Sequence, residues 1–319
     1  MEAKREGDKE KKRHSGLIGF VILALVVICF IIMAINSKKP GRLELGQVDK
    51  EVNGAAFIKA NQLIMEQIGD NWLPNDLFWP TLFLDNMPNF QMGELEVVRY
   101  NIRVLRDNLS RMRTTDKLDP GVEGAFTALS NDPYKWWFPS AESKWKKANE
   151  DLQAYYEGIR GGTSFFYPRS DNLVELLSQY VSLMGGVNTR LMNAPQRKGT
   201  VLQDTGDGVK ESEAKEMIQI NIPWRQIDDN FYYAQGVSYA LYESFKAIRI
   251  DFYNLLKRKN SLQFVDKIIE NLERCYFEPW IVFNGSPNSI FANHSLNVSG
   301  VFNDARQKIY SLIVALQQG

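Results

Sequence analysis

The residue types that most often perform catalysis are scarce in this sequence. Two His and two Cys occur among its 319 residues, and only His294 and Cys275 lie beyond residue 36. Zinc enzymes bind their metal through three or four side chains, and no second imidazole accompanies His294. A Cys–His hydrolase needs a nucleophile on a defined turn, which the local sequences RCYF and ANHS do not provide. Glycine-rich phosphate loops are also absent from the sequence. We therefore predict neither a metal nor a cofactor.

Carboxylates are the remaining catalytic option, because two Asp or Glu side chains suffice for glycoside hydrolysis at any sequence spacing. Six acidic residues lie near aromatic ones, as a sugar site would require: Asp85, Asp132, Glu142, Asp228, Asp229 and Glu278. Acidic residues in such positions more often cap helices than perform catalysis. An envelope hydrolase that uses a carboxylate pair is therefore kept as an alternative hypothesis.

An uninterrupted apolar segment divides the chain near its N-terminus. Gly16 to Ile35 carries no charge over twenty residues, and a helix of that length spans a hydrocarbon core of about 30 Å. The segment is longer than the apolar region of a cleaved signal peptide, and Asn36 to Pro40 lacks the small-residue pattern of a cleavage site. The sequence therefore predicts an uncleaved signal-anchor helix over 16–35.

The charges on either side of this segment predict its orientation. Basic residues mark the cytoplasmic flank of a membrane-spanning helix. Six of them precede the segment and three follow it: Lys4, Arg5, Lys9, Lys11, Lys12 and Arg13 before, Lys38, Lys39 and Arg42 after. We expect a cytoplasmic tail over 1–15, a tether over 36–47, and an exported domain over 48–319.

Apolar residues in the exported part recur at alternating spacings of three and four. This spacing places them on one stripe of a helix and is typical of helices that pack lengthwise in a bundle or coiled coil. The stripes cover Leu95 to Met112, Trp145 to Ile159, Leu173 to Leu191, Leu241 to Leu255, Leu262 to Leu272 and Phe302 to Leu316, with a less regular helix over Val48 to Ile68. The predicted fold is mainly α, an N-terminal transmembrane helix followed by an elongated multi-helix bundle with long ordered loops.

Four segments depart from this pattern. The Gly185–Gly186 pair predicts a kink or a close helix contact within its helix. Residues 195–216 are rich in Gly and charge and are expected to form an exposed, mobile loop. Ile218 to Ile222 and Trp280 to Phe283 have weak strand character, and we favour extended loops over strands for both.

Three loops carry more apolar residues than a solvent-exposed loop needs: 71–90, 131–145 and 277–297. In the first loop, three prolines oppose a regular helix while Trp and Phe side chains require burial or a partner. These loops either cap the bundle or form a docking surface for a partner, an envelope polymer or the membrane interface. The candidate partner-binding residues are Trp72, Pro74, Asn75, Asp76, Trp79, Asp85, Asn86, Pro88, Trp136, Trp137, Asn293 and His294.

Short strings in the same loops resemble a protein family. They are LPNDL at 73–77, LDNMPNFQ at 84–91, FPSAES at 138–143 and FANHSL at 291–296, behind the N-terminal span. With that span they resemble a family of bacterial inner-membrane proteins known only as a domain of unknown function. The resemblance implies a Gram-negative bacterium and a periplasmic location for the bundle, and it supplies no activity or catalytic residue.

Composition and motifs together favour an interaction protein. The 38 basic and 38 acidic residues balance, so the pervasive basic field of a nucleic-acid binder is absent, and two Cys cannot form a disulfide framework. We expect a membrane-anchored periplasmic scaffold of the bacterial envelope, without catalytic activity. Its expected partners are other inner-membrane or periplasmic proteins and the bilayer through residues 16–35. The apolar stripes can close either within one chain or between copies in a homo-oligomer, and both alternatives stay open. A binding module for peptidoglycan, glycan or lipid is the other alternative.

Overall fold

The computed structural model is an all-helical bundle with one short hairpin in the part that it describes. The described residues are 2–46, 48–49, 52–77, 79–194, 198–202, 217–221, 227–277, 279, 282 and 293–318. The helices are α1 (Glu2–Asn36), α2 (Ala55–Asp70), α3 (Asn86–Val104), α4 (Pro120–Leu129), α5 (Ala141–Arg160), α6 (Ser170–Asn193), α7 (Ile227–Asp251), α8 (Tyr253–Arg258), α9 (Leu262–Arg274) and α10 (His294–Gln317). A 3-10 turn, η1 (Thr81–Phe83), precedes α3, and a π-helical turn, η2 (Leu105–Leu109), follows it.

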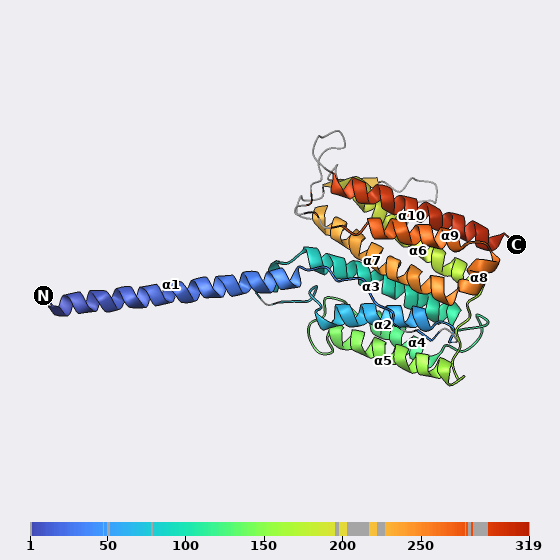
Figure 1. Cartoon of the computed structure of the whole chain (residues 1–319), viewed down its shortest axis with the longest axis horizontal. Helices are drawn as coiled ribbons and strands as arrows, with labels where there is room; N and C mark the ends of the chain where they lie inside the picture. The colour runs from blue at the N-terminus through green and yellow to red at the C-terminus, as the bar shows by residue number, and fades with distance from the viewer. Residues whose placement is uncertain are drawn as a thin grey trace, which may run out of the picture.

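Helix α1 projects from one end of the bundle, roughly along the direction of α2 and α3 (Figure 1). Its segment Gly16–Asn36 has a mean hydropathy of 3.4, and only 6% of the most apolar window is buried. The helix is therefore long and apolar enough to cross a membrane, as the sequence predicts.

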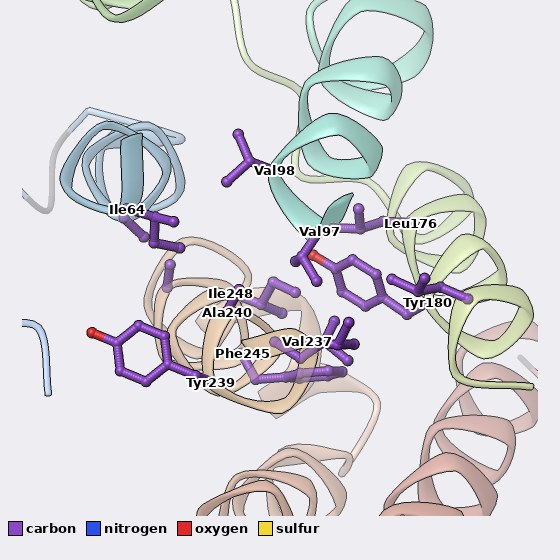
Figure 2. Close-up of a cluster of buried hydrophobic side chains, with 14 of the residues drawn as sticks. Ile64, Val97, Val98, Leu176, Tyr180, Val237, Tyr239, Ala240, Phe245 and Ile248 are labelled. Atoms are coloured by element: carbon purple, nitrogen blue, oxygen red, sulfur yellow. The ribbon is translucent and has the colours of Figure 1, made fainter. Parts of the chain in front are cut away.

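The bundle has a central pair of helices covered on two sides. Helices α3 and α7 pack against each other along most of their length. On one side of this pair lie α2, α4 and α5, and on the other lie α6, α9 and α10 (Figure 1). Figure 2 shows the resulting core, where Ile64 of α2, Val97 of α3, and Leu176 and Tyr180 of α6 surround the α7 side chains.

A polar cluster lies inside this apolar core. The Asn101 amide nitrogen donates to Asn61 Oδ1 at 2.8 Å and to Ser244 Oγ at 3.0 Å. The Tyr180 hydroxyl donates to Asn101 Oδ1 at 2.5 Å. Since Asn101 is fully buried, these bonds provide partners for groups that would otherwise be costly to bury, and they join α2, α3, α6 and α7.

Most of the predicted helices are confirmed, and the differences between their predicted and observed bounds have local causes. Helix α2 begins at Ala55, seven residues later than predicted, where Asp251 accepts hydrogen bonds from the Ala56 and Phe57 amides. Helix α3 begins inside the proline-rich loop because Pro88 lies in its first turn, where a missing N–H breaks no helical bond. Helix α4, capped by Asp119, was not predicted.

Close contacts occur at glycines other than the pair that the sequence singles out. A Cβ on Gly236 would lie 1.9 Å from the Phe90 carbonyl oxygen, and one on Gly93 would lie 2.3 Å from the Tyr233 carbonyl oxygen. Helices α3 and α7 therefore touch backbone to backbone at these positions. Gly185 does lie against another helix, since its Cβ would meet Arg306 of α10 at 3.1 Å, whereas Gly186 faces open space and α6 continues through both.

The predicted loops between α6 and α7 are partly strands. Strand β1 (Lys198–Leu202) pairs antiparallel with β2 (Met217–Asn221), with Thr200 opposite Gln219. The prediction of an extended loop was thus wrong for residues 218–221, and that of a mobile loop was wrong for 198–202. The rest of 195–216 and all but Val282 of Trp280–Phe283 lie outside the described residues.

Candidate functional site

Two of the three apolar loops meet at the end of the bundle from which α1 leaves. The Asn71 side chain donates to Asn36 Oδ1 at the end of α1, at 2.7 Å, and η1 contacts α1. The second loop is bound to the first, because the Trp72 indole N–H donates to the Pro133 carbonyl at 2.8 Å. Both loops contain a cis bond before proline, at Pro80 and Pro139. The bundle end beside α1 thus consists of both loops.

Eight large apolar side chains are exposed among the described residues of these loops. Trp79 is 60% exposed and Phe138 is 87% exposed, fractions typical of side chains without a partner in the protein. We call this group the α1-side surface: Leu77, Trp79, Leu82, Phe83, Tyr134, Trp136, Trp137 and Phe138. Contiguous exposed apolar residues usually mark a contact with another molecule or with a membrane.

Some predicted partner-binding residues are instead buried and hold the loops in place. Trp72 is 3% exposed and packs edge-to-face on Trp145 of α5, with ring centroids 5.6 Å apart. Asn75 is also buried, and its amide donates to the Lys135 carbonyl at 3.2 Å and to Glu142 Oε1 at 3.0 Å. These two side chains attach both loops to the start of α5 rather than meet a partner.

The remaining candidates in these loops divide by exposure. Trp79, Trp136 and Trp137 belong to the α1-side surface, and the latter two form an edge-to-face pair with centroids 5.3 Å apart. Asp85 is exposed at the N-cap position of α3. The other candidates in these loops are half-buried: Pro74, Asp76, Asn86 and Pro88.

Asn293 and His294 lie at the start of α10. The Asn293 side chain caps that helix by accepting a hydrogen bond from the Leu296 amide at 3.0 Å. The His294 ring contacts Phe231 and Phe277, with centroids 6.3 and 6.1 Å apart, and burial lowers its pKa. Both residues are therefore part of the packing at this end, and residues 283–292 before them lie outside the description.

The tether is bound to α7 and to the segment after α9, which the sequence did not predict. The Tyr276 hydroxyl donates to the Pro40 carbonyl at 2.5 Å, and the Tyr239 hydroxyl donates to the Gly41 carbonyl at 2.6 Å. A hydroxyl that bonds a main-chain carbonyl fixes the path of the chain there. The chain is thus attached to the bundle within a few residues of leaving α1.

Basic side chains of the tether strengthen this attachment. The Lys39 ammonium donates to Gln235 Oε1, and it lies 5.1 Å from the centroid of the Tyr232 ring. The Arg42 guanidinium lies 4.0 Å from the centroid of the Tyr242 ring. Cation–π contacts at these distances each contribute about 0.5 to 2 kcal/mol.

One sequence signal could have revealed this attachment. Tyr232, Tyr239 and Tyr242 are spaced by seven and three residues, so they share one face of α7. A stripe of tyrosine rings on one helix and basic side chains in the tether can pair through cation–π contacts. The two segments are almost two hundred residues apart, and their pairing could not be read from either one alone.

The six acidic residues considered for hydrolysis have mostly structural surroundings. Glu142 accepts from Asn75, and Asp132 accepts from the Tyr134 amide at 2.9 Å. Asp228 and Asp229 share the first turn of α7, and burial followed by the negative charge of Asp228 raises the pKa of Asp229 to about 6. Glu278 lies outside the described residues.

No group of three or more His, Cys, Asp or Glu side chains that could hold a metal ion occurs among the described residues. Cys275 is fully buried in the core, and its pKa is raised to about 12 mainly by desolvation. A thiol with such a pKa stays protonated and is a poor nucleophile at neutral pH.

A family model described as an uncharacterized protein conserved in bacteria, DUF2333, matches residues 9–319. The chain belongs to this bacterial family. The match extends over nearly the whole sequence and confirms the resemblance found in the loop motifs. Curated proteins and solved structures gave no match.

The motifs that resemble the DUF2333 family gather at the α1 end of the bundle. LPNDL and LDNMPNFQ include the first apolar loop and the start of α3, and FPSAES includes the end of the second loop and the start of α5. Of FANHSL, only residues 293–296 are described, at the start of α10. The family assigns no chemistry to these segments, so their function has to be inferred from their geometry.

Proposed function

We propose that this protein is a single-pass scaffold of the bacterial inner membrane, with a cytoplasmic N-terminus and a periplasmic bundle that contacts other envelope proteins. The observation that carries this proposal is the fixed joint between α1 and the bundle. The tether is bound to Tyr239 and Tyr276, and the end of α1 is bound to Asn71. A domain attached in this way has a defined orientation relative to its anchor.

A defined orientation matters more for a scaffold than for an enzyme. A domain that acts on diffusing substrates works equally well on a flexible tether, since rotation about the tether does not limit encounter. A scaffold has to present the same face to partners that are themselves held in the membrane. The bound tether therefore favours a scaffold, and the basic residues before Gly16 favour the cytoplasmic N-terminus.

The two alternatives have less support in the geometry. A glycan-binding module needs a flat aromatic face on which a sugar ring can stack. The exposed Trp136 and Trp137 rings lie at 80° to each other and do not form such a platform. A hydrolase would depend on Asp228, Asp229 and the neighbouring Asp85, whose charge adds to burial in raising the pKa of both, since Glu142 and Asp132 already accept hydrogen bonds within the bundle.

Orientation and partner contact can be tested separately. An alkaline phosphatase fused after Gly319 should be active, because this enzyme matures only outside the cytoplasm, and a green fluorescent protein at the same place should be dark. Activity in the opposite pattern would refute the proposed orientation.

Partner contact can be tested with a photoreactive amino acid on the flanks of the bundle. Tyr310 on α10 and Phe165 before α6 are exposed and lie away from α1 contacts. A scaffold should give one discrete protein adduct, recovered again when the photoreactive group is placed on the identified partner. The absence of a protein adduct from every flank position would refute the scaffold. Loss of the protein's function in cells on substitution of Asp229→Asn would favour the hydrolase.

A further inference from the structure

We propose that the α1-side surface lies in the headgroup region of the same membrane that α1 crosses, with lipid as its partner. The inference deepens the proposed function and depends on its membrane anchor. It identifies what covers the eight exposed apolar side chains, and it gives the bundle a second attachment to the bilayer beside the helix itself.

The first step is the distance between the membrane and the bundle. The apolar segment of α1 ends at Asn36, and Lys39 is already bound to the bundle through Gln235. Three residues of extended chain span at most about 11 Å. The headgroup layer on each side of the hydrocarbon core is about 5 to 8 Å thick. This upper limit exceeds the thickness of the headgroup layer by only about 3 to 6 Å, so the end of the bundle lies at the headgroups or within a few ångströms of them.

The second step is the position of the first loop at this end. The Asn71 side chain is bonded directly to Asn36, and η1, which contains the exposed Leu82 and Phe83, contacts α1. These residues therefore lie at the depth at which the apolar part of α1 ends. In Figure 1 α1 runs in roughly the same direction as α2 and α3, so a membrane crossed by α1 would meet the end of the bundle rather than its side.

The second loop extends the same end away from α1. It is held against the first loop by the bond from Trp72 to the Pro133 carbonyl and by the bond from Asn75 to the Lys135 carbonyl. Trp136 and Trp137 follow directly and are more than half exposed. The surface therefore widens the contact beyond the cross-section of a single helix.

The third step is the chemistry of the exposed residues. The surface includes three Trp and one Tyr, the two residue types enriched where proteins meet the membrane–water interface. Their rings bury apolar area while the indole N–H or phenol O–H stays hydrated, which suits a layer of headgroups and water. The charged neighbours are mixed, Lys135 beside Asp76 and Asp132, so attraction to anionic lipid is not required.

The test uses the full-length protein in cells, with a benzophenone amino acid at one position at a time. Trp79 and Trp137 report on the α1-side surface. Phe30 is the matched control within α1, because it is exposed there and must meet lipid if α1 spans the membrane. Tyr253, exposed on α8 at the opposite end of the bundle, is the control away from the membrane (Figure 1).

The expected result is lipid adducts from Phe30, Trp79 and Trp137, detected by mass spectrometry, and none above background from Tyr253. Lipid adducts from Phe30 alone, with protein, second-copy or only intrachain products from Trp79 and Trp137, would overturn the inference and leave the anchor intact. An absence of lipid adducts from Phe30 would overturn the anchor of the proposed function and the inference with it.

Discussion

The crossing of α3 and α7 offers a sharp test of the fold, through the substitution Gly236→Ala. The added Cβ would lie 1.9 Å from the Phe90 carbonyl oxygen and 2.8 Å from the Phe90 carbonyl carbon. Both are main-chain atoms, which no change of rotamer can move. The oxygen would have to withdraw by roughly 1 Å to reach the shortest distances that real Cβ contacts show, and separation by 0.5 to 1 Å already forfeits about a quarter to a half of each affected van der Waals contact.

The expected loss can be estimated by comparing two opposing effects. Overpacking of a well-packed core costs about 1 to 3 kcal/mol, and an obstacle made of backbone places Gly236→Ala at the upper end or above it. Alanine recovers about 1 kcal/mol over glycine in a helix interior. We expect the free energy of unfolding to fall by about 2 to 4 kcal/mol. Gly186→Ala, a mid-helix control with nothing within 4 Å, should instead gain up to about 1 kcal/mol.

The assay is denaturant unfolding of the full-length protein in micelles, followed by circular dichroism at 222 nm. Gly93→Ala should resemble Gly236→Ala, because its Cβ would meet the opposite helix at 2.3 Å. Equal stabilities of Gly236→Ala and Gly186→Ala would show that the two helices do not touch as described, and the reasoning would be refuted.

Three further predictions concern the core, pH and the tether. Asn101→Ala should lower the free energy of unfolding by about 3 kcal/mol in the same assay, because it leaves the buried Tyr180 hydroxyl without its acceptor. Burial raises the pKa of Asp251 to about 7, so the folded state binds this proton more tightly than the unfolded state does. Its contribution to stability is therefore present below pH 4 and lost as pH rises to about 7, and Asp251→Asn should remove that slope from unfolding curves measured between pH 4 and 8. Arg42→Ala should speed limited proteolysis of the tether and lower the free energy of unfolding by about 0.5 to 2 kcal/mol, since it removes the cation–π contacts with Tyr242 and Tyr276.

Each of these has a result that would count against it. A change below about 1 kcal/mol for Asn101→Ala would mean that water or another group replaces the lost amide. Parallel pH profiles of the wild-type protein and Asp251→Asn would show that other groups set the slope. Proteolysis of Arg42→Ala at the wild-type rate would indicate that the hydroxyl bonds to Pro40 and Gly41 hold the tether by themselves.

The sequence predicted the long helices because their apolar residues follow one period. Helix α5 is an example, since Trp145, Leu152 and Tyr155 lie on its predicted stripe and are all buried. Helix α4 was missed because its contact with α5 is made by small residues. A Cβ on Gly121 would lie 2.8 Å from the Asp151 carbonyl oxygen, so the two helices can approach this closely only because Gly121 has no side chain. A search for periodic apolar residues does not detect such a contact.

The α1-side surface was predictable only in part, because its loops also lack a regular apolar period. The apolar character of the loops is visible in the sequence, but a chain without a helical or strand period gives no indication of which side chain faces the core. Trp72 and Trp79 are seven residues apart in one loop, yet one is 3% and the other 60% exposed. The difference arises because Trp72 reaches Trp145 on α5, a residue that only the fold brings near it.

The same loop thus contains apolar residues of two kinds, and their contrast bears on function. Trp72 and Asn75 already attach the loop to the bundle, so Trp79 and Phe83 are not needed to close its core. Large aromatic side chains left in water lower solubility and promote association unless something covers them. The short bound tether holds these side chains at the depth where the apolar segment of α1 ends. A bilayer at that depth would cover them without any further protein. Exposure on this surface is then a property of the isolated chain, and in the membrane the same residues would help to set the angle at which the bundle stands.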